Sequence, residues 1–102
     1  MSVLSGVEFK EKFGHKFYKV LANDLVHYGF KYQIGINVDP IKFNPSGTCN
    51  KGGLYFTDIK NILRFIGYGN KIGYIEILND SLVYIEDNKY KAEKLVVSEI
   101  VC

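Results

Sequence analysis

Three segments near the C-terminal end decide the fold: KIGYIEIL (71–78), SLVYIE (81–86) and KLVVSEIV (94–101). All three are rich in β-branched and aromatic residues, which suit the half-buried, pleated surface of a sheet. Asn-Asp at 79–80 and Asp-Asn at 87–88 punctuate them, and such side chains hydrogen-bond to the backbone of turns. The pattern predicts three strands joined by short connections, in a mostly antiparallel sheet.

Shorter segments toward the N-terminus predict further strands. KFYKVL (16–21) and LYF (54–56) carry the same mixture of aromatic and aliphatic residues. The stretch 27–39 also favours strand, but Gly29 and Gly35 interrupt it, as glycines at bulges and close approaches do. We therefore expect an irregular strand region there.

One helix is predicted between these strands, over about residues 58–66. Thr57 or Asp58 can cap its N-terminus, where a carboxylate also suits the positive end of the helix dipole. Glycines at 67 and 69 supply a left-handed stop. Its apolar side chains recur at i, i+3, i+4 and i+7: Ile59, Ile62, Leu63 and Ile66. We expect this stripe to face the core, so that Ile62→Asp would unfold the domain.

Several strands, one amphipathic helix and short connections predict a compact two-layer α+β domain. The length of 102 residues fits one domain. Residues 1–12 show no clear period, and we expect them to form a mobile N-terminal arm. The folded domain would then span residues 13–102.

The composition excludes several classes of protein. Hydrophobic residues make up 47% of the chain and aromatic residues 15%, which excludes low-hydrophobicity disorder. No stretch approaches the roughly 20 apolar residues of a membrane helix. Residues 1–9 lack the basic start and apolar core of a secretion signal. We therefore expect an intracellular protein that is neither secreted nor held in a membrane.

The basic residues are 12 Lys and a single Arg, Arg64. Lys, Ile, Asn and Tyr have AT-rich codons, so the bias is typical of an AT-rich genome. A chain with one Arg is poorly equipped for bidentate recognition of phosphate. The net charge of +2 is also too even to argue for nucleic acid. The Lys-rich segments 10–19 and 89–94, with Tyr18 and Tyr90 as stacking partners, predict at most weak nucleic-acid binding.

The loop NPSGTCNKGG (44–53) invites a phosphate-binding interpretation. Gly47 and Gly52 have the spacing of the two glycines in a P-loop. Gly-Leu at 53–54 nevertheless stands where Lys-Ser/Thr is required, and a strand follows where a helix should begin. A structural loop is therefore favoured.

The cysteines and histidines form no recognisable site. Cys49 could act as a nucleophile with His15 or His27 as base, but such pairs have no fixed spacing. Two Cys and two His without paired spacing do not predict a metal site. Cys49 and Cys102 also cannot build a disulfide scaffold.

A longer constellation runs through several predicted elements: HYG (27–29), KGGLYFTD (51–58), Tyr68, GYIEI (73–77) and EKLVV (93–97). This order resembles the core of ADP-ribosyltransferases of the poly-ADP-ribose polymerase type. The resemblance implies an NAD site in which His27 contacts ribose and Tyr55 and Tyr68 stack on nicotinamide. Glu93 would orient the acceptor and stabilise the oxocarbenium-like state, and flat rings and a carboxylate suit these roles.

A resemblance of another kind covers about residues 16–98. It rests on FYKVL (17–21), HYGFKYQIGINVDPIKFNPSG (27–47), CNKGGLYFTDI (49–59) and YIEDNKYKAEKLVVSE (84–99). These segments are similar to short proteins and N-terminal modules of giant amoeba-infecting DNA viruses of the mimivirus and marseillevirus type. Some of those modules precede ankyrin repeats, and the AT-rich bias agrees with such genomes.

The leading hypothesis is a small non-enzymatic giant-virus protein, either a virion component or a host-interaction module. It has no catalytic residues, metal or cofactor, and it acts in the host cytoplasm or in the particle. Its partner is a viral or host protein, and a homodimer is left open. The alternatives are an ADP-ribosyltransferase-like NAD-handling domain, which would use His27, Tyr55, Tyr68 and Glu93, and a weak nucleic-acid binder.

Overall fold

The computed structural model describes residues 3–46 and 51–102. These residues form short strands and two short helices, which confirms the α+β class. In order they are β1 (Val3–Ser5), α1 (Gly6–Phe13), β2 (Phe17–Leu21), β3 (Val26–His27), β4 (Phe30–Lys31), β5 (Gly35–Val38), β6 (Leu54–Phe56), the 3₁₀ helix η1 (Ile62–Tyr68), β7 (Lys71–Glu76), β8 (Leu82–Ile85), β9 (Tyr90–Ala92) and β10 (Lys94–Val101).

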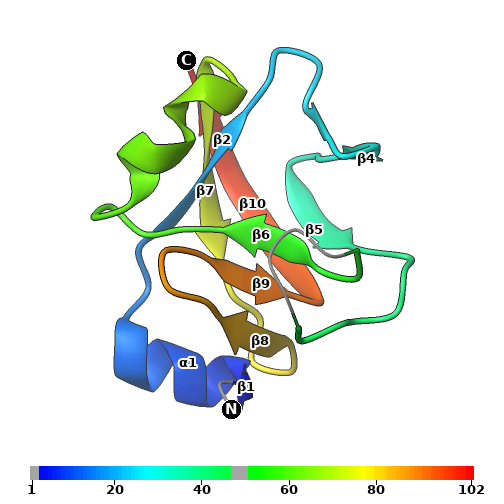
Figure 1. Ribbon diagram of the computed structural model, residues 1–102, viewed down its shortest axis with the longest axis vertical. Coiled ribbons are helices and arrows are strands. Elements are labelled where there is room, and N and C mark those ends of the chain that lie inside the picture. Colours follow the sequence, from blue (N-terminus) through cyan, green and yellow to red (C-terminus); the bar gives the residue numbers. More distant parts are fainter. Residues whose placement is uncertain (1–2, 47–50) are drawn as a thin grey trace.

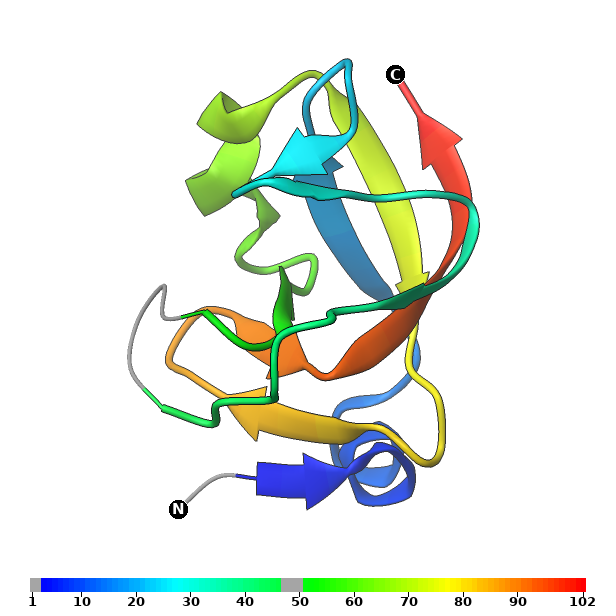
Figure 2. The same ribbon diagram turned by 90° about the vertical axis from the view of Figure 1, so that its right-hand side faces the viewer.

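The described residues form two four-stranded sheets, in the orders β1-β8-β9-β6 and β2-β7-β10-β5, and a two-stranded ribbon of β3 and β4. Every strand pair is antiparallel. Only Glu93 separates β9 from β10, so one nearly continuous strand passes from the first sheet into the second. In Figure 1, β6, β8 and β9 run across the view while β2 and β7 run along it, and Figure 2 shows the two sheets from the side.

The strands predicted from the last third of the sequence are confirmed as β7, β8 and β10. Ile75 of β7 lies opposite Val97 of β10, and both are buried because alternate side chains point to the same face. β8 pairs with β9 and β1 rather than with β7. The turn at 79–80 therefore carries the chain from one sheet to the other.

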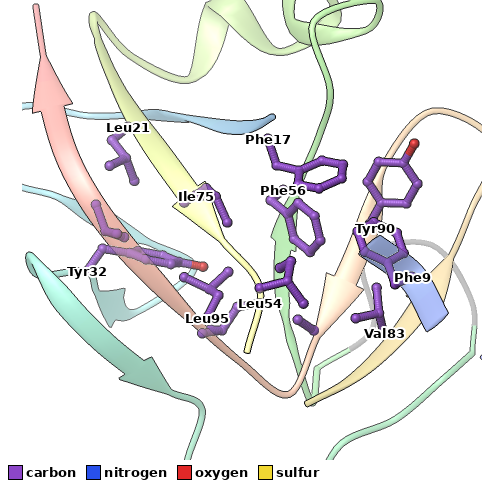
Figure 3. Packing of buried hydrophobic residues seen from close by; sticks show 13 residues of the cluster. Phe9, Phe17, Leu21, Tyr32, Leu54, Phe56, Ile75, Val83, Tyr90 and Leu95 are labelled. Atoms are coloured by element: carbon purple, nitrogen blue, oxygen red, sulfur yellow. The ribbon is translucent and has the colours of Figure 1, made fainter. Parts of the chain in front are cut away.

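The core lies between the sheets and under α1, and Phe9 is at its aromatic end. The Phe9 ring centroid lies 4.9 Å from that of Phe17, 5.0 Å from that of Tyr90 and 5.9 Å from that of Phe56. Such pairs add about 0.5–1.5 kcal/mol each beyond the area they bury. Figure 3 shows these rings gathered together, with aliphatic residues and one further ring toward the other end: Leu21, Ile75, Leu95 and Tyr32.

The N-terminal segment differs from the prediction of a mobile arm over residues 1–12. Residues 3–12 form β1 and most of α1, and Phe9 is completely buried. A capping box starts the helix: Ser5 Oγ accepts from Glu8 N (3.2 Å) and Glu8 Oε1 accepts from Ser5 N (3.0 Å). Gly6 packs against Leu78, where a Cβ would clash with the carbonyl oxygen. The packed domain therefore includes this segment.

The predicted amphipathic helix over 58–66 is wrong in type and in orientation. The segment begins as a turn and becomes the 3₁₀ helix η1, in which no residue is buried. Ile59, Leu63 and Ile66 are 66%, 74% and 64% exposed. Thr57 does not cap a helix, because its backbone exchanges two 2.8 Å hydrogen bonds with Tyr18 and so extends β6.

The end of this segment is fixed by backbone packing rather than by its apolar stripe. Gly69 lies against Leu21 of β2, where a Cβ would clash with the Leu21 carbonyl. Asp58 Oδ1 accepts from Asn61 N (3.1 Å) and Asn61 Nδ2 (3.0 Å), which stabilises a turn before η1. With 3.0 residues per turn, η1 cannot keep a stripe spaced for 3.6 on one face.

Candidate functional site

Three of the four residues that the transferase resemblance singled out line one small pocket. His27 comes from β3, Tyr55 from β6 and Tyr68 from η1. The pocket has a volume of about 40 Å³, well below the roughly 300–1,000 Å³ typical of small-molecule sites. Its remaining walls are Tyr18, Lys19, Val20, Tyr28, Phe56, Thr57, Phe65 and Lys89.

Glu93, the fourth residue, does not line this pocket. It lies between β9 and β10, where its Oε1 accepts a hydrogen bond from Leu82 N at 2.9 Å. The carboxylate near the pocket is instead that of Glu86, which accepts from the Tyr55 hydroxyl at 3.3 Å. The structure therefore brings together the two rings and the histidine but not the acid that the transferase chemistry needs.

His27 is held among aromatic rings. Its ring stacks on Tyr28 (4.4 Å between centroids) and meets Tyr68 edge-on (5.1 Å). Among the residues that the structure describes, His27 Nε2 is the one buried side-chain polar atom without a hydrogen-bond partner. Burial lowers the pKa of the imidazole to about 4, and the charges of Lys19 and Lys89 add to the shift. The ring is therefore neutral at pH 7.

Two lysines contribute amines close to this histidine. Lys19 is only 4% exposed, its Nζ donates to the Tyr55 carbonyl at 2.8 Å, and it lies 4.9 Å from the centroid of the Tyr32 ring. Burial lowers the pKa of the Lys19 amine to about 7, helped by the charge of Lys89. Lys89 Nζ lies 4.3 Å from the Tyr55 ring centroid. Tyr55 therefore connects both amines to the pocket.

Lys19 is the site residue that sequence reasoning missed, although a signal for it is present. Phe17, Lys19 and Leu21 have the same parity in β2, so a strand that buries the two apolar residues must also bury the lysine. A charged residue at a core-facing position is costly unless it is partnered or functional. The two-residue alternation of side chains along this strand would have identified Lys19 as a core-facing lysine.

A second pocket of about 280 Å³ adjoins the first and shares His27, Tyr28 and Tyr55 with it. Asp39 holds one side of this second pocket in place. Its Oδ1 accepts from Ile41 N and its Oδ2 from Gly53 N, both at 2.9 Å. A Cβ at Gly53 would clash with the side chain of the buried Lys91, so that lysine requires glycine there.

An open groove of about 630 Å³ lies beside β5 and has a mostly apolar lining. Val38, Ile41 and Leu82 are 56%, 48% and 43% exposed. Lys94 lies at the charged side of the groove and forms an ion pair with Asp80 at 2.9 Å. Its other lining residues are Asp39, Pro40, Lys42, Phe43, Pro45 and Glu93.

The remaining candidates from the sequence find less support. Gly47 and Cys49 lie outside the described residues, and within these no group of three metal-ligating side chains comes together. Tyr90 is buried with its hydroxyl donating to Asp58 Oδ2 (2.8 Å), so it cannot stack on a base. In the described part of the chain no helix is long and apolar enough to cross a membrane.

Fold and site together define a compact α+β domain with a small aromatic and basic pocket and a separate apolar groove. No family model matches the chain. No solved structure matches it either. Three curated proteins of Acanthamoeba polyphaga mimivirus are similar to it, each named "Putative ankyrin repeat protein" and distinguished as R868, R896 and R229.

R868 is 31% identical over 100 residues, which cover 91% of this chain and 50% of R868. R896 is 32% identical over 88 residues (80% of this chain, 26% of R896). R229 is 37% identical over 59 residues (58% and 19%). The chain thus spans half or less of these relatives. The similarity supports the relationship to giant-virus proteins and gives no support to the transferase resemblance.

Proposed function

We propose that this domain is a non-enzymatic interaction module that holds an extended segment of another polypeptide along β5. The observation that carries the proposal is the exposed apolar side of this strand, on which Ile36 and Val38 are each 56% exposed. The partner would be a viral or host protein, met in the host cytoplasm or in the particle.

β5 has the properties of a strand that accepts another. It lies at the end of its sheet and pairs with β10 alone among the described strands. It contains neither a charged residue nor a proline, the usual protections of a sheet edge. Gln33 Nε2 donates to the Ile36 carbonyl (3.2 Å), so a partner strand would replace this contact or begin at Val38.

The groove supplies specificity for such a segment. Because side chains alternate along a strand, a polypeptide added to β5 would place every second residue on the same face. Val38 belongs both to β5 and to the groove, so this face leads into the apolar lining. We infer that the groove accepts apolar side chains at alternate positions of the partner.

The mimivirus relatives are consistent with a module of this kind. Their names describe ankyrin repeats, and the region similar to this chain is half or less of each. A binding domain beside a repeat array would give such proteins a second contact surface.

Peptide selection tests the proposal directly. Random peptides of about 10 residues, displayed on phage, are selected on the wild-type chain. We expect enrichment of alternating apolar residues, and at least a tenfold loss of affinity with Val38→Lys in calorimetry, about 1.4 kcal/mol. Leu63→Lys is the matched control, an exposed leucine on η1 that should leave affinity unchanged. Equal loss in both variants, or peptides without the alternation, would overturn the proposal.

Sedimentation velocity at rising concentration tests a second copy as the occupant. A dimer that Val38→Lys abolishes assigns the β5 edge to self-pairing. A dimer that persists in both Ile36→Lys and Val38→Lys has its interface elsewhere and rules out self-pairing at β5.

A further inference from the structure

The pocket of His27, Tyr55 and Tyr68 shares no lining residue with the β5 groove, so its ligand would be a separate one. A water needs roughly 10–15 Å³ of such a cavity, and the volume of about 40 Å³ therefore admits about three heavy atoms. Most of the lining residues carry flat rings: Tyr18, His27, Tyr28, Tyr55, Phe56, Phe65 and Tyr68. The shape favours a small planar group.

Three side-chain nitrogens at the wall can donate hydrogen bonds. Lys19 carries up to three N–H donors, and the Tyr55 carbonyl accepts one of them. His27 Nε2 is buried without a partner, and in the tautomer with its proton on Nε2 it is a second donor. Lys89 adds a third nitrogen to the lining. Together they favour an acceptor with negative charge.

Among the described residues, no aspartate or glutamate lines the pocket. Glu86 is held by the Tyr55 hydroxyl (3.3 Å), and Asp58 by the Tyr90 hydroxyl (2.8 Å). Neither residue lines the pocket. An anion bound there would therefore meet amines and an imidazole rather than acids.

We propose that this pocket binds a carboxylate group that lies among the rings and accepts hydrogen bonds from Lys19 Nζ and His27 Nε2. A carboxylate is flat, has three heavy atoms and presents two acceptor oxygens. It thus matches the pocket in size, in shape and in the number of donors.

Binding should take up a proton near neutral pH. The titratable groups that line the pocket are Tyr18 and Lys19 from β2, His27 and Tyr28 from the β3 hairpin, Tyr55 from β6, Tyr68 from η1 and Lys89 from the turn before β9. With the pKa of Lys19 at about 7, the amine is mostly charged at pH 6.5 and mostly neutral at pH 8. We expect affinity to fall by up to about tenfold between these values.

Nuclear magnetic resonance of the two imidazoles tests the proposal, with sodium formate as the probe against sodium chloride at equal ionic strength. Formate should raise the pKa of His27 from about 4 by about 1 unit or more. His15, which is exposed, is the internal control and should behave alike in both salts. No difference at His27, or an equally large response to phosphate, would overturn the assignment to a carboxylate.

Substitutions distinguish the contributions of Lys19 and Lys89 to formate binding. Lys19→Met should raise the formate concentration needed at His27 at least tenfold. Lys89→Gln should raise it by a smaller factor, about threefold, because this lysine acts by charge near the pocket. Lys31→Gln removes the same charge from exposed Lys31 and should have no effect. If Lys19→Met does not fold, Lys89→Gln is compared with Lys31→Gln. Equal formate concentrations for the response at His27 in these two variants would reject the site.

The same spectra distinguish two sources of the carboxylate. N-acetyl-glutamic acid α-amide presents only a side-chain carboxylate. A response to both it and formate assigns the pocket to an acidic side chain of a polypeptide. A response to formate alone assigns it to a small free acid. Because Val38→Lys leaves this pocket intact, failure of peptide binding at β5 would not affect either result.

Discussion

The helices α1 and η1 are attached to the strands in contrasting ways. α1 buries only Gly6 and Phe9, yet Phe9 is inaccessible to solvent and contacts four other rings. η1 has the more regular apolar spacing and buries no residue. A single deeply inserted side chain therefore anchors one helix, whereas glycine packing at the end of the segment positions the other.

The apolar stripe of η1 is regular in sequence, yet its side chains are not buried. A regular apolar stripe shows that a segment can present one apolar face, but it does not show that the fold supplies a surface for that face. At η1 the neighbouring strand is β2, whose residues are already buried around Lys19 and Leu21. The side chains of Leu63 and Ile66 consequently remain exposed.

The largest expected effect is at α1. Phe9→Ala should lower the free energy of unfolding by about 3–5 kcal/mol, because it leaves a cavity among Phe13, Phe17, Phe56 and Tyr90. Urea denaturation followed by tyrosine fluorescence measures it. Phe13→Ala is the matched control on the same helix, and since Phe13 is 37% exposed we expect a loss of about 1–2 kcal/mol. Equal losses would show that Phe9 has no special position.

The next largest effect concerns the buried amine of Lys19, which lines the same pocket as Phe65 and Tyr68 of η1. The folded pKa of Lys19, about 7, is lower than the unfolded value of 10.5, so the unfolded chain binds more protons between these pH values. Stability should therefore rise with pH from about 7 toward 10.5, by up to about 1.4 kcal/mol per unit. Denaturation from pH 7 to 9.5 measures the slope, below the range where the raised pKa values of Tyr32 and Tyr90 reverse it.

His27 gives a separate dependence at acid pH. Its pKa is about 4 in the folded chain and 6.5 in the unfolded chain, so the free energy of unfolding falls as the pH is lowered from 6.5 to 4.

Lys19→Met should remove the rise in stability at alkaline pH, whereas Lys31→Met, which removes an exposed lysine, should leave that rise unchanged. A wild-type slope that Lys19→Met leaves intact would mean that another group titrates there.

The strands of the last third were predictable because their residues alternate and their turns carry Asn and Asp. The helix α1 was not predicted, because eight residues with one buried aromatic side chain show no helical period of apolar residues. Ser5 and Glu8 nevertheless have the spacing of a capping box. The shift in register between Val97 and Glu99 depends on pairing with β7, which no local pattern encodes.

The candidate site was predictable in part for the same reason. The resemblance named His27, Tyr55 and Tyr68, which line one pocket, while the parity of β2 could have added Lys19. Glu93 could not be placed from local sequence. It lies where the chain leaves β9 for β10, and the bend between two sheets decides which way it faces.

The smallest expected effect is at the exposed stripe of η1. Leu63→Asp should change the free energy of unfolding by no more than about 0.5 kcal/mol, because Leu63 is 74% exposed and its carboxylate replacement stays in water. Leu54→Asp is the matched control, since Leu54 is 2% exposed and a charge there should prevent folding. Both are read from the same urea curves. Cooperative unfolding of Leu63→Asp at a much lower urea concentration would mean that the stripe packs against a surface in solution. The contrast with α1 would then lie in what covers each helix, not in how deeply its side chains insert.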